Sequence, residues 1–127
     1  MRVIVAGSRG ITSATLVYSH LDRILGDRPE ITVISGTARG VDQLGEQWGM
    51  DRGHDVERYP ADWDRYGKSA GYRRNEVMAK NADALIAFWD RDSRGTKHMI
   101  DLAETYGLIV FVIDHNGMPV VWPKESQ

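Results

Sequence analysis

Five short apolar runs, separated by segments with helical spacing, constrain the fold of this chain more than any other feature. The runs occupy residues 2–6, 31–35, 56–59, 84–88 and 108–113. Most of them lack the polar–apolar alternation of a half-exposed strand, which is typical of strands covered on both faces. They therefore predict a sheet that is buried between two layers of helices.

The segments between the runs carry apolar residues at helical spacing. Val17, Leu21 and Leu25 recur at i, i+4 and i+8, with Ser13 as a candidate N-cap and Gly26 as a candidate stop. Three further helices are predicted: one from residue 41 to Gly53, one beginning near Ser69 and one ending at Gly107. Such alternation implies right-handed crossovers and predicts a Rossmann-like three-layer α/β domain, with a mainly parallel sheet of about five strands and helices on both faces.

The length of the chain suits one domain, and we expect residues 1–127 to form it. Residues 118–127 are predicted to be a short edge strand and tail. Asn116 and Gly117 would form a two-residue hairpin turn that leads into an antiparallel strand over residues 120–122.

Composition and the N-terminal residues exclude or disfavour several classes of function. The chain has no cysteine, so disulfides, thiolate metal sites and thiol nucleophiles are excluded. A net charge of -2 without a long basic block disfavours non-specific binding of nucleic acid. The first residues lack the long apolar stretch of a signal peptide or membrane span, so we expect a cytoplasmic protein without membrane contact. We predict no metal or other cofactor, because the four histidines lack metal-ligand spacing.

Three Arg–Gly pairs lie in or just after the carboxyl ends of predicted strands, where parallel sheets bind ligands. Glycine permits close backbone approach, and guanidinium can bind phosphate in a bidentate manner. The loops either cradle an anionic ligand or contain the glycines that any strand-to-helix turn needs. They lack the GK[ST] of a Walker A loop. The candidate residues in these loops are Gly7, Ser8, Arg9, Gly10, Gly36, Thr37, Ala38, Arg39, Gly40, Ser93, Arg94, Gly95 and Thr96.

Arg74 is a further candidate because its position places a charge on the apolar face of a predicted helix. It precedes Val77 and Met78 by three and four residues. A charge there normally requires a partner. Arg74 either pairs with a structural carboxylate, Asp42 or Asp90, or points into the crevice toward a ligand phosphate.

Several other side chains allow both a functional and a structural interpretation. Trp63, Tyr66 and Tyr72 could stack on a base from a lid, or pack the loop down, with Trp63 the strongest candidate for packing. Asp90 and Asp92 could hold a magnesium ion with ligand phosphates, or be solvated or cap the following helix. His98 could lie near the crevice, or be a surface residue of its helix.

The motifs VAGSRG, SGTARGVD, PADWDRYGKSAGYRRNEVM and ADALIAFWDRDSRGTKHMI, taken together, resemble the SLOG superfamily, named for Smf/DprA and the lonely-guy proteins. The similarity is to its small YspA and YpsA-related branch of bacteria and phages, and it extends from residue 2 to about residue 113. The resemblance implies a Rossmann-like domain that binds a nucleotide or nucleotide-derived ligand, and a homodimer. It also implies that Arg74 and Asn75 contact phosphate or ribose, and that Asp42 orients an arginine or accepts a ribose hydroxyl.

The lonely-guy members of that superfamily are phosphoribohydrolases that pair an arginine with a glutamate in PGGxGTxxE. By motif position the arginine matches Arg74, and the glycine and threonine match Gly95 and Thr96. Met99 stands where the glutamate would be and cannot act as an acid or base. Glu76 or Asp101 could substitute, although nothing in the sequence directs either carboxylate at a ribose, so the catalytic residues are left unassigned.

Three functions follow from the resemblance. The leading one is binding of a nucleoside monophosphate or an ADP-ribose-like ligand, as a sensor, carrier or sponge. The second is hydrolysis of a nucleotide N-glycosidic bond through a non-standard carboxylate. The third, a DprA-like module for single-stranded DNA, is disfavoured by the mild acidity and small size of the chain.

Overall fold

Five parallel strands form one sheet in the computed structural model, which describes residues 1–120. Their spatial order is β3-β2-β1-β4-β5, and every neighbouring pair is parallel. The strands are β1 (Arg2–Gly7), β2 (Thr32–Ser35), β3 (Asp55–Arg58), β4 (Ala84–Phe88) and β5 (Ile109–Ile113). The predicted Rossmann-like α/β fold is confirmed.

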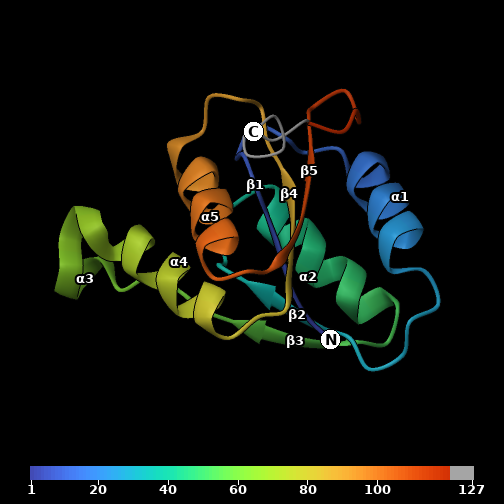
Figure 1. Ribbon diagram of the computed structural model, residues 1–127, viewed down its shortest axis with the longest axis horizontal. Coiled ribbons are helices and arrows are strands. Elements are labelled where there is room, and N and C mark those ends of the chain that lie inside the picture. The colour runs from blue at the N-terminus through green and yellow to red at the C-terminus, as the bar shows by residue number, and fades with distance from the viewer. Residues whose placement is uncertain (121–127) are drawn as a thin grey trace.

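Helices cover both faces of this sheet, two on each side (Figure 1). α1 (Ala14–Leu25) and α2 (Val41–Asp51) pack on one face, whereas α4 (Ala70–Lys80) and α5 (Arg94–Thr105) pack on the other. Two short elements precede α4: α3 (Trp63–Tyr66) and the 3-10 helix η1 (Gly67–Ser69). Among the residues that the structure describes, no helix is long and apolar enough to cross a membrane.

The central strand β1 explains why the apolar runs do not alternate with polar residues. Val3 and Val5 belong to the core beneath α1 and α2, whereas Ile4 and Ala6 belong to the core beneath α4 and α5. Both faces of β1 are therefore buried, and an apolar residue is favourable at every position.

The predicted ends of the first helix are confirmed. The Ser13 side chain accepts a hydrogen bond from the Leu16 amide of α1, at 3.1 Å, as an N-cap does. Gly26 ends the helix with a positive φ of 51°. The other predicted helices and strands are present, with ends shifted by a few residues.

The hairpin after β5 differs from the prediction. Its turn is closed by the Gly117 amide donating to the Asp114 carbonyl at 2.9 Å, so Asn116 is central and Gly117 closes the turn. The Asp114 amide also donates to the Met118 carbonyl at 2.8 Å, so the hairpin has a three-residue loop, 115–117, with Gly117 at its left-handed position (φ +81°), instead of the predicted two-residue turn. Pro119 forms an isolated antiparallel bridge to Ile113; residues 121–127, with the end of the predicted edge strand, lie outside the described residues.

The strand order changes direction between β1 and β4. The chain adds β2 and β3 on one side of β1, then returns through α4 to place β4 on the other side. The loops that leave β1 and β4 therefore diverge at the carboxyl edge of the sheet. At such a point an open parallel sheet forms a crevice, the usual ligand position in this class of fold.

Candidate functional site

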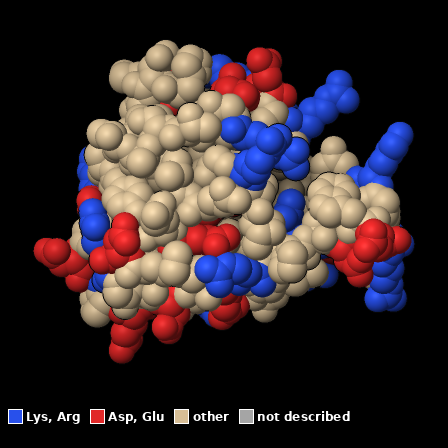
Figure 2. Space-filling view, turned by 180° about the vertical axis from the view of Figure 1, so that it is seen from behind, with Lys and Arg blue, Asp and Glu red and all other residues tan. Residues whose placement is uncertain are grey.

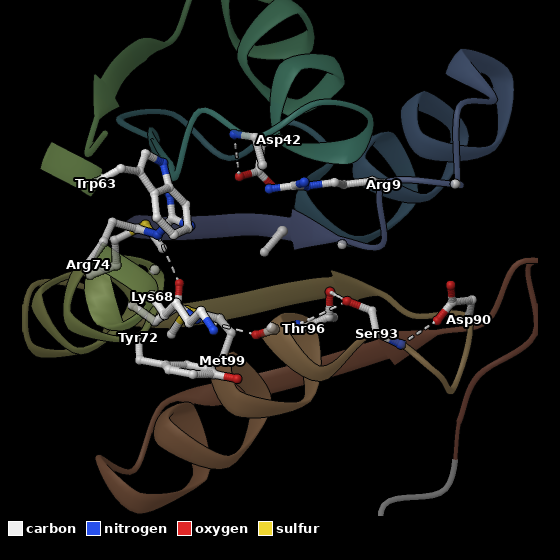
Figure 3. Close-up of a pocket in the computed structure, with 18 residues that line it drawn as sticks. Arg9, Asp42, Trp63, Lys68, Tyr72, Arg74, Asp90, Ser93, Thr96 and Met99 are labelled. Atoms are coloured by element: carbon white, nitrogen blue, oxygen red, sulfur yellow. Dashed lines mark hydrogen bonds between the residues drawn. The ribbon is translucent and has the colours of Figure 1, made fainter. Parts of the chain in front are cut away.

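A cavity of about 480 Å³ opens at this point, bounded by the β1 loop, the start of α2, the α3–α4 segment and the start of α5 (Figure 3). Its size falls in the range of small-molecule sites. The predicted site residues that line it are Gly7, Arg9, Gly10, Ala38, Asp42, Arg74, Asn75, Ser93, Gly95 and Thr96. The structure thus brings together residues from all three Arg–Gly loops and from α4.

The remaining predicted site residues, Ser8, Gly36, Thr37, Arg39, Gly40 and Arg94, lie outside the cavity wall. Ser8 and Gly36 nevertheless stabilise the cavity wall from behind. The buried Ser8 hydroxyl accepts a hydrogen bond from the Asp90 amide at 3.0 Å, which ties the β1 loop to the β4 loop. The Gly36 carbonyl accepts a hydrogen bond from Arg74.

The Arg74 side chain is held by neutral acceptors and faces the cavity. Its guanidinium donates to the Gly36 carbonyl and, through Nε, to the Asn75 side-chain oxygen at 3.0 Å. Burial lowers the pKa of Arg74; the negative charge of Asp42 opposes this shift, and the positive charge of Arg9 adds to it. The predicted ion pair with Asp42 or Asp90 is not formed among the described residues; Arg74 is anchored by the neutral acceptors and faces the cavity, as the other predicted role requires.

Asp42 is the buried carboxylate of the site. Its side chain accepts a hydrogen bond from the Ala38 amide at 3.1 Å, and only 5% of the residue is exposed. Burial raises the pKa of Asp42 to about 6, against the opposing effects of the Ala38 amide and the Arg74 charge. Glycine at position 36 leaves room for the Arg74 guanidinium in this position, because a Cβ there would lie 2.7 Å from Arg74 Nη1 and 3.0 Å from Asp42 Oδ2 and would displace them.

Asn75 has a role that the sequence did not reveal. Its amide oxygen accepts from Arg74, and its amide nitrogen lies 3.3 Å from the Gly95 carbonyl and 3.2 Å from His98 Nδ1. The residue is 6% exposed, so most of its hydrogen-bonding capacity is used inside the protein. Asn75 thus fixes Arg74 relative to the start of α5, and half-buried His98 lies behind the cavity wall.

The start of α5 forms the floor of the site. The Ser93 side chain caps the helix by accepting from the Thr96 amide at 3.3 Å. Asp90 orders the turn before it, since one carboxylate oxygen accepts from the amides of Asp92 and Ser93, both at 2.8 Å. Burial opposes ionisation of Asp90, but these amides outweigh burial and lower its pKa.

Asp90 does not cap α5, because Ser93 is the N-cap; the Asp90 carboxylate instead holds the turn before the helix through the Asp92 and Ser93 amides. Among the described residues, no three potential ligands from histidine and the acidic side chains cluster as a metal site would require.

Comparisons with known proteins agree with this geometry. Residues 1–66 match the profile of the YspA, cpYpsA-related SLOG family. Over 116 residues the chain is 37% identical to the Gene 61 protein of Mycobacterium phage D29, covering 86% of this chain and 93% of that protein. The chain belongs to the YspA, cpYpsA-related SLOG family. Membership indicates a nucleotide-related function on a Rossmann-like fold.

Solved structures show that this SLOG fold is shared more widely. DNA processing protein A (DprA) from Streptococcus pneumoniae superimposes with a TM-score of 0.69 at 18% identity, covering 88% of this chain and 49% of DprA. The SLOG chain therefore spans about half the length of DprA, and the likeness concerns the fold alone. A predicted subunit of tRNA methyltransferase from Methanocaldococcus jannaschii matches with a TM-score of 0.45 at 17% identity, over 88% of this chain and 67% of that one.

The carboxylates that could replace the lonely-guy glutamate in this SLOG chain lie elsewhere. Glu76 pairs with Lys80 at 3.0 Å, and Asp101 pairs with Lys97 at 2.9 Å; all four side chains are at least half exposed. Neither acid lines the cavity, whereas Met99 does, with 1% of its surface exposed. The suggestion that Glu76 or Asp101 serves this site is therefore wrong for the geometry observed.

The α3–α4 segment contributes further residues to the cavity wall, for which the sequence left both a functional and a structural role open. Trp63 and Tyr72 line the cavity, and they are 53% and 45% exposed. Trp63 packs against α4 at Gly71 and also presents exposed surface to the cavity, so it combines the packing position with a place in the wall. Tyr66 lies outside, with its ring between the guanidinium groups of Arg65 and Arg73.

Lys68, Gly71 and Met78 were not predicted as site residues. In the sequence, Lys68 and Gly71 lie between Trp63 and Tyr72, two aromatic residues that are candidates for base stacking. This position is the feature of the sequence that could have identified them.

Proposed function

We propose that this SLOG protein binds a nucleotide or nucleotide-derived anion, a nucleoside monophosphate or an ADP-ribose-like compound, and acts as a sensor, carrier or sponge. The observation that carries the proposal is the charge of the cavity wall. Arg9, Lys68 and Arg74 all line the cavity, against the carboxylates of Asp42 and Asp90. Asp90 is already engaged by backbone amides, so positive charge predominates where a ligand would enter.

The arginines favour a phosphate group in particular. Arg9 is close enough to Arg74 for its charge to lower the pKa of Arg74. A phosphate between the two guanidinium groups would relieve this repulsion and could form bidentate hydrogen bonds with either. The Thr96 amide donates to the Ser93 side chain, but the Gly95 amide in the first turn of α5 lacks a carbonyl partner within the helix, so it too favours an anion.

A second candidate is hydrolysis of a nucleotide N-glycosidic bond, in which water adds to the anomeric carbon and the base leaves with a proton. The observation in its favour is Asp42, whose pKa of about 6 suits a carboxylate that exchanges protons near neutral pH. Against it, Met99 occupies the position of the lonely-guy glutamate and contributes only an apolar surface to the cavity.

Binding and hydrolysis are distinguished in one experiment. The purified protein is incubated with nucleoside monophosphates, NAD and ADP-ribose, and the melting temperature and any released base are measured in the same samples. A ligand that raises the melting temperature and is recovered intact supports binding, because selective binding to the native state stabilises it. Released base that is absent with Asp42→Asn would instead support hydrolysis.

Arg74→Ala tests the proposed phosphate contact, and Arg73→Ala is its matched control. Arg73 is the next residue of α4, but its guanidinium lies over the Tyr66 ring and outside the cavity. We expect Arg74→Ala to weaken binding by about tenfold or more, since a charge-assisted hydrogen bond contributes roughly 1.5–3 kcal/mol. Calorimetric titration should show little change for Arg73→Ala. Equal affinities of the two variants would contradict the assignment of Arg74.

A further inference from the structure

Two aromatic side chains occupy one side of the cavity wall. Trp63 is the first residue of α3, and Tyr72 lies in the first turn of α4. Each keeps about half of its surface exposed, although both lie in a concave wall. Burying such a ring is favourable, so two exposed rings facing one cavity indicate a surface that awaits a partner group.

Both rings are held in place by the protein. The Trp63 ring lies against the backbone of α4 at Gly71, where its Cη2 atom would be 3.4 Å from an added Cβ. Asp62 caps the short helix that carries Trp63, by accepting from the Arg65 amide at 3.1 Å. The Tyr72 ring packs edge-on against His98, with 4.5 Å between ring centroids. Fixed rings lose little conformational entropy on binding a flat group.

Gly71 lines the same cavity beside the Trp63 ring, and the protein itself does not require a glycine there. It lies in a helix, has no positive φ, and an added Cβ would make only ordinary contacts with Trp63 and Arg74. Alanine would be preferred in a helix by up to about 1 kcal/mol. The absence of a side chain at Gly71 therefore leaves room in the wall beside the Trp63 ring and the Arg74 guanidinium.

We infer that the wall formed by Trp63, Gly71 and Tyr72 binds a planar aromatic group, the nucleobase of the ligand. This inference rests on the proposed function, because the phosphate of the same ligand would lie at Arg74 and Arg9. Base–aromatic stacking tolerates any base, so the wall selects nucleosides against bare sugar phosphates rather than one base against another. The ligand class is therefore an intact nucleoside phosphate, and ribose 5-phosphate should bind more weakly.

AMP and ribose 5-phosphate, titrated into the wild type and into Trp63 variants, test this inference. We expect Trp63→Leu to weaken AMP binding about tenfold and to leave ribose 5-phosphate binding unchanged. Trp63→Phe, which keeps a ring, should retain most of the AMP affinity. Tyr106→Leu is the matched control, because Tyr106 is also an exposed aromatic residue, with 42% of its surface exposed, but lies outside the cavity. AMP, but not ribose 5-phosphate, should quench tryptophan fluorescence, and Trp63→Phe should remove this quenching.

Gly71→Ala provides a second variant in case Trp63→Leu lowers the melting temperature. It leaves both rings and the helix in place and adds one methyl group to the wall, so it should weaken AMP binding more than ribose 5-phosphate binding. The inference is wrong if AMP and ribose 5-phosphate bind the wild type equally, or if Trp63→Leu weakens both by the same factor. If AMP does not bind but another nucleotide of the panel does, that nucleotide replaces AMP in the same comparison. If no nucleoside monophosphate, NAD or ADP-ribose binds the wild type, the proposed function fails, and the inference fails with it.

Discussion

At the scale of single residues, the glycines of the site fall into two kinds. Gly36 has a packing reason, because a Cβ there would lie 2.7 Å from Arg74 Nη1 and would displace the guanidinium from its observed position. Gly95 has none, because an added Cβ would meet nothing within 4 Å and the residue lies in the first turn of α5. At a position such as 95, glycine lowers the stability of the helix, and no packing contact requires it. Such a glycine is expected where a ligand approaches the backbone.

Gly95→Ala should therefore separate stability from binding. We expect the free energy of unfolding to rise by about 0.5–1 kcal/mol, because alanine is the better helix former. Affinity for AMP should fall, since the new methyl group occupies the cavity wall. Urea denaturation and calorimetric titration measure the two effects. Higher stability with unchanged affinity would show that no ligand approaches α5 at this point.

Asp42 predicts a pH dependence of binding with a definite sign. Its pKa is raised to about 6, so it gains a proton as the pH falls from 8 to 5 and loses its negative charge beside Arg74. Affinity for ADP-ribose, whose phosphates stay ionised over this range, should therefore rise as the pH falls. Asp42→Asn should reduce this dependence. Burial lowers the pKa of His98. The wild type and the Asp42→Asn variant both contain His98, so the difference between their affinity–pH curves reports on Asp42. Parallel affinity–pH curves for the two proteins would contradict the role of Asp42.

At the scale of the elements, features set by near neighbours in the chain were predictable. The first helix begins at Ser13 and ends at Gly26 as expected, since each residue acts through its own backbone and the adjacent turn. The partners of Asn75 were not predictable, because they lie on α5, 20 and 23 residues further along the chain. The place of Trp63 in the wall likewise depends on how α3 packs on α4.

Two helix caps allow a comparison between a helix at the cavity and one away from it. Ser93 caps α5 and lines the cavity, whereas Ser13 caps α1 and does not. Substitution of either serine by alanine should lower the free energy of unfolding by about 1 kcal/mol. Only Ser93→Ala should also weaken AMP binding, since it loosens the turn that presents Gly95. Calorimetry would refute this if both variants bound AMP with wild-type affinity.

At the scale of the whole molecule, the sheet order rather than any single motif creates the site. The reversal between β1 and β4 brings together loops that are far apart in the chain: Ser8 and Asp90, which are hydrogen-bonded, lie 82 positions apart in a chain of 127 residues. Acidic and basic side chains lie near one another over the lower and right-hand parts of the face shown in Figure 2, and its upper left is largely uncharged. The net charge of -2 and this mixed surface agree with a small-molecule site better than with a nucleic-acid channel.

The exposed apolar side chains Val77 on α4 and Tyr106 at the end of α5 fit the homodimer that the family resemblance implies. We propose that the protein is a homodimer in solution. Light scattering coupled to size exclusion should give twice the 14.3 kDa mass of the chain. A mass of one chain at all concentrations tested would contradict this.

The segment of α3 and η1 lies outside both hydrophobic cores and contains no buried residue. Substitutions there disturb little of the packing that keeps the domain folded. A protein of this architecture can therefore acquire a new ligand preference through changes in one short stretch of chain, while the sheet and its helices are inherited unchanged. Divergence among relatives should be concentrated in that stretch, and exchanging it between two of them should transfer ligand choice without transferring stability.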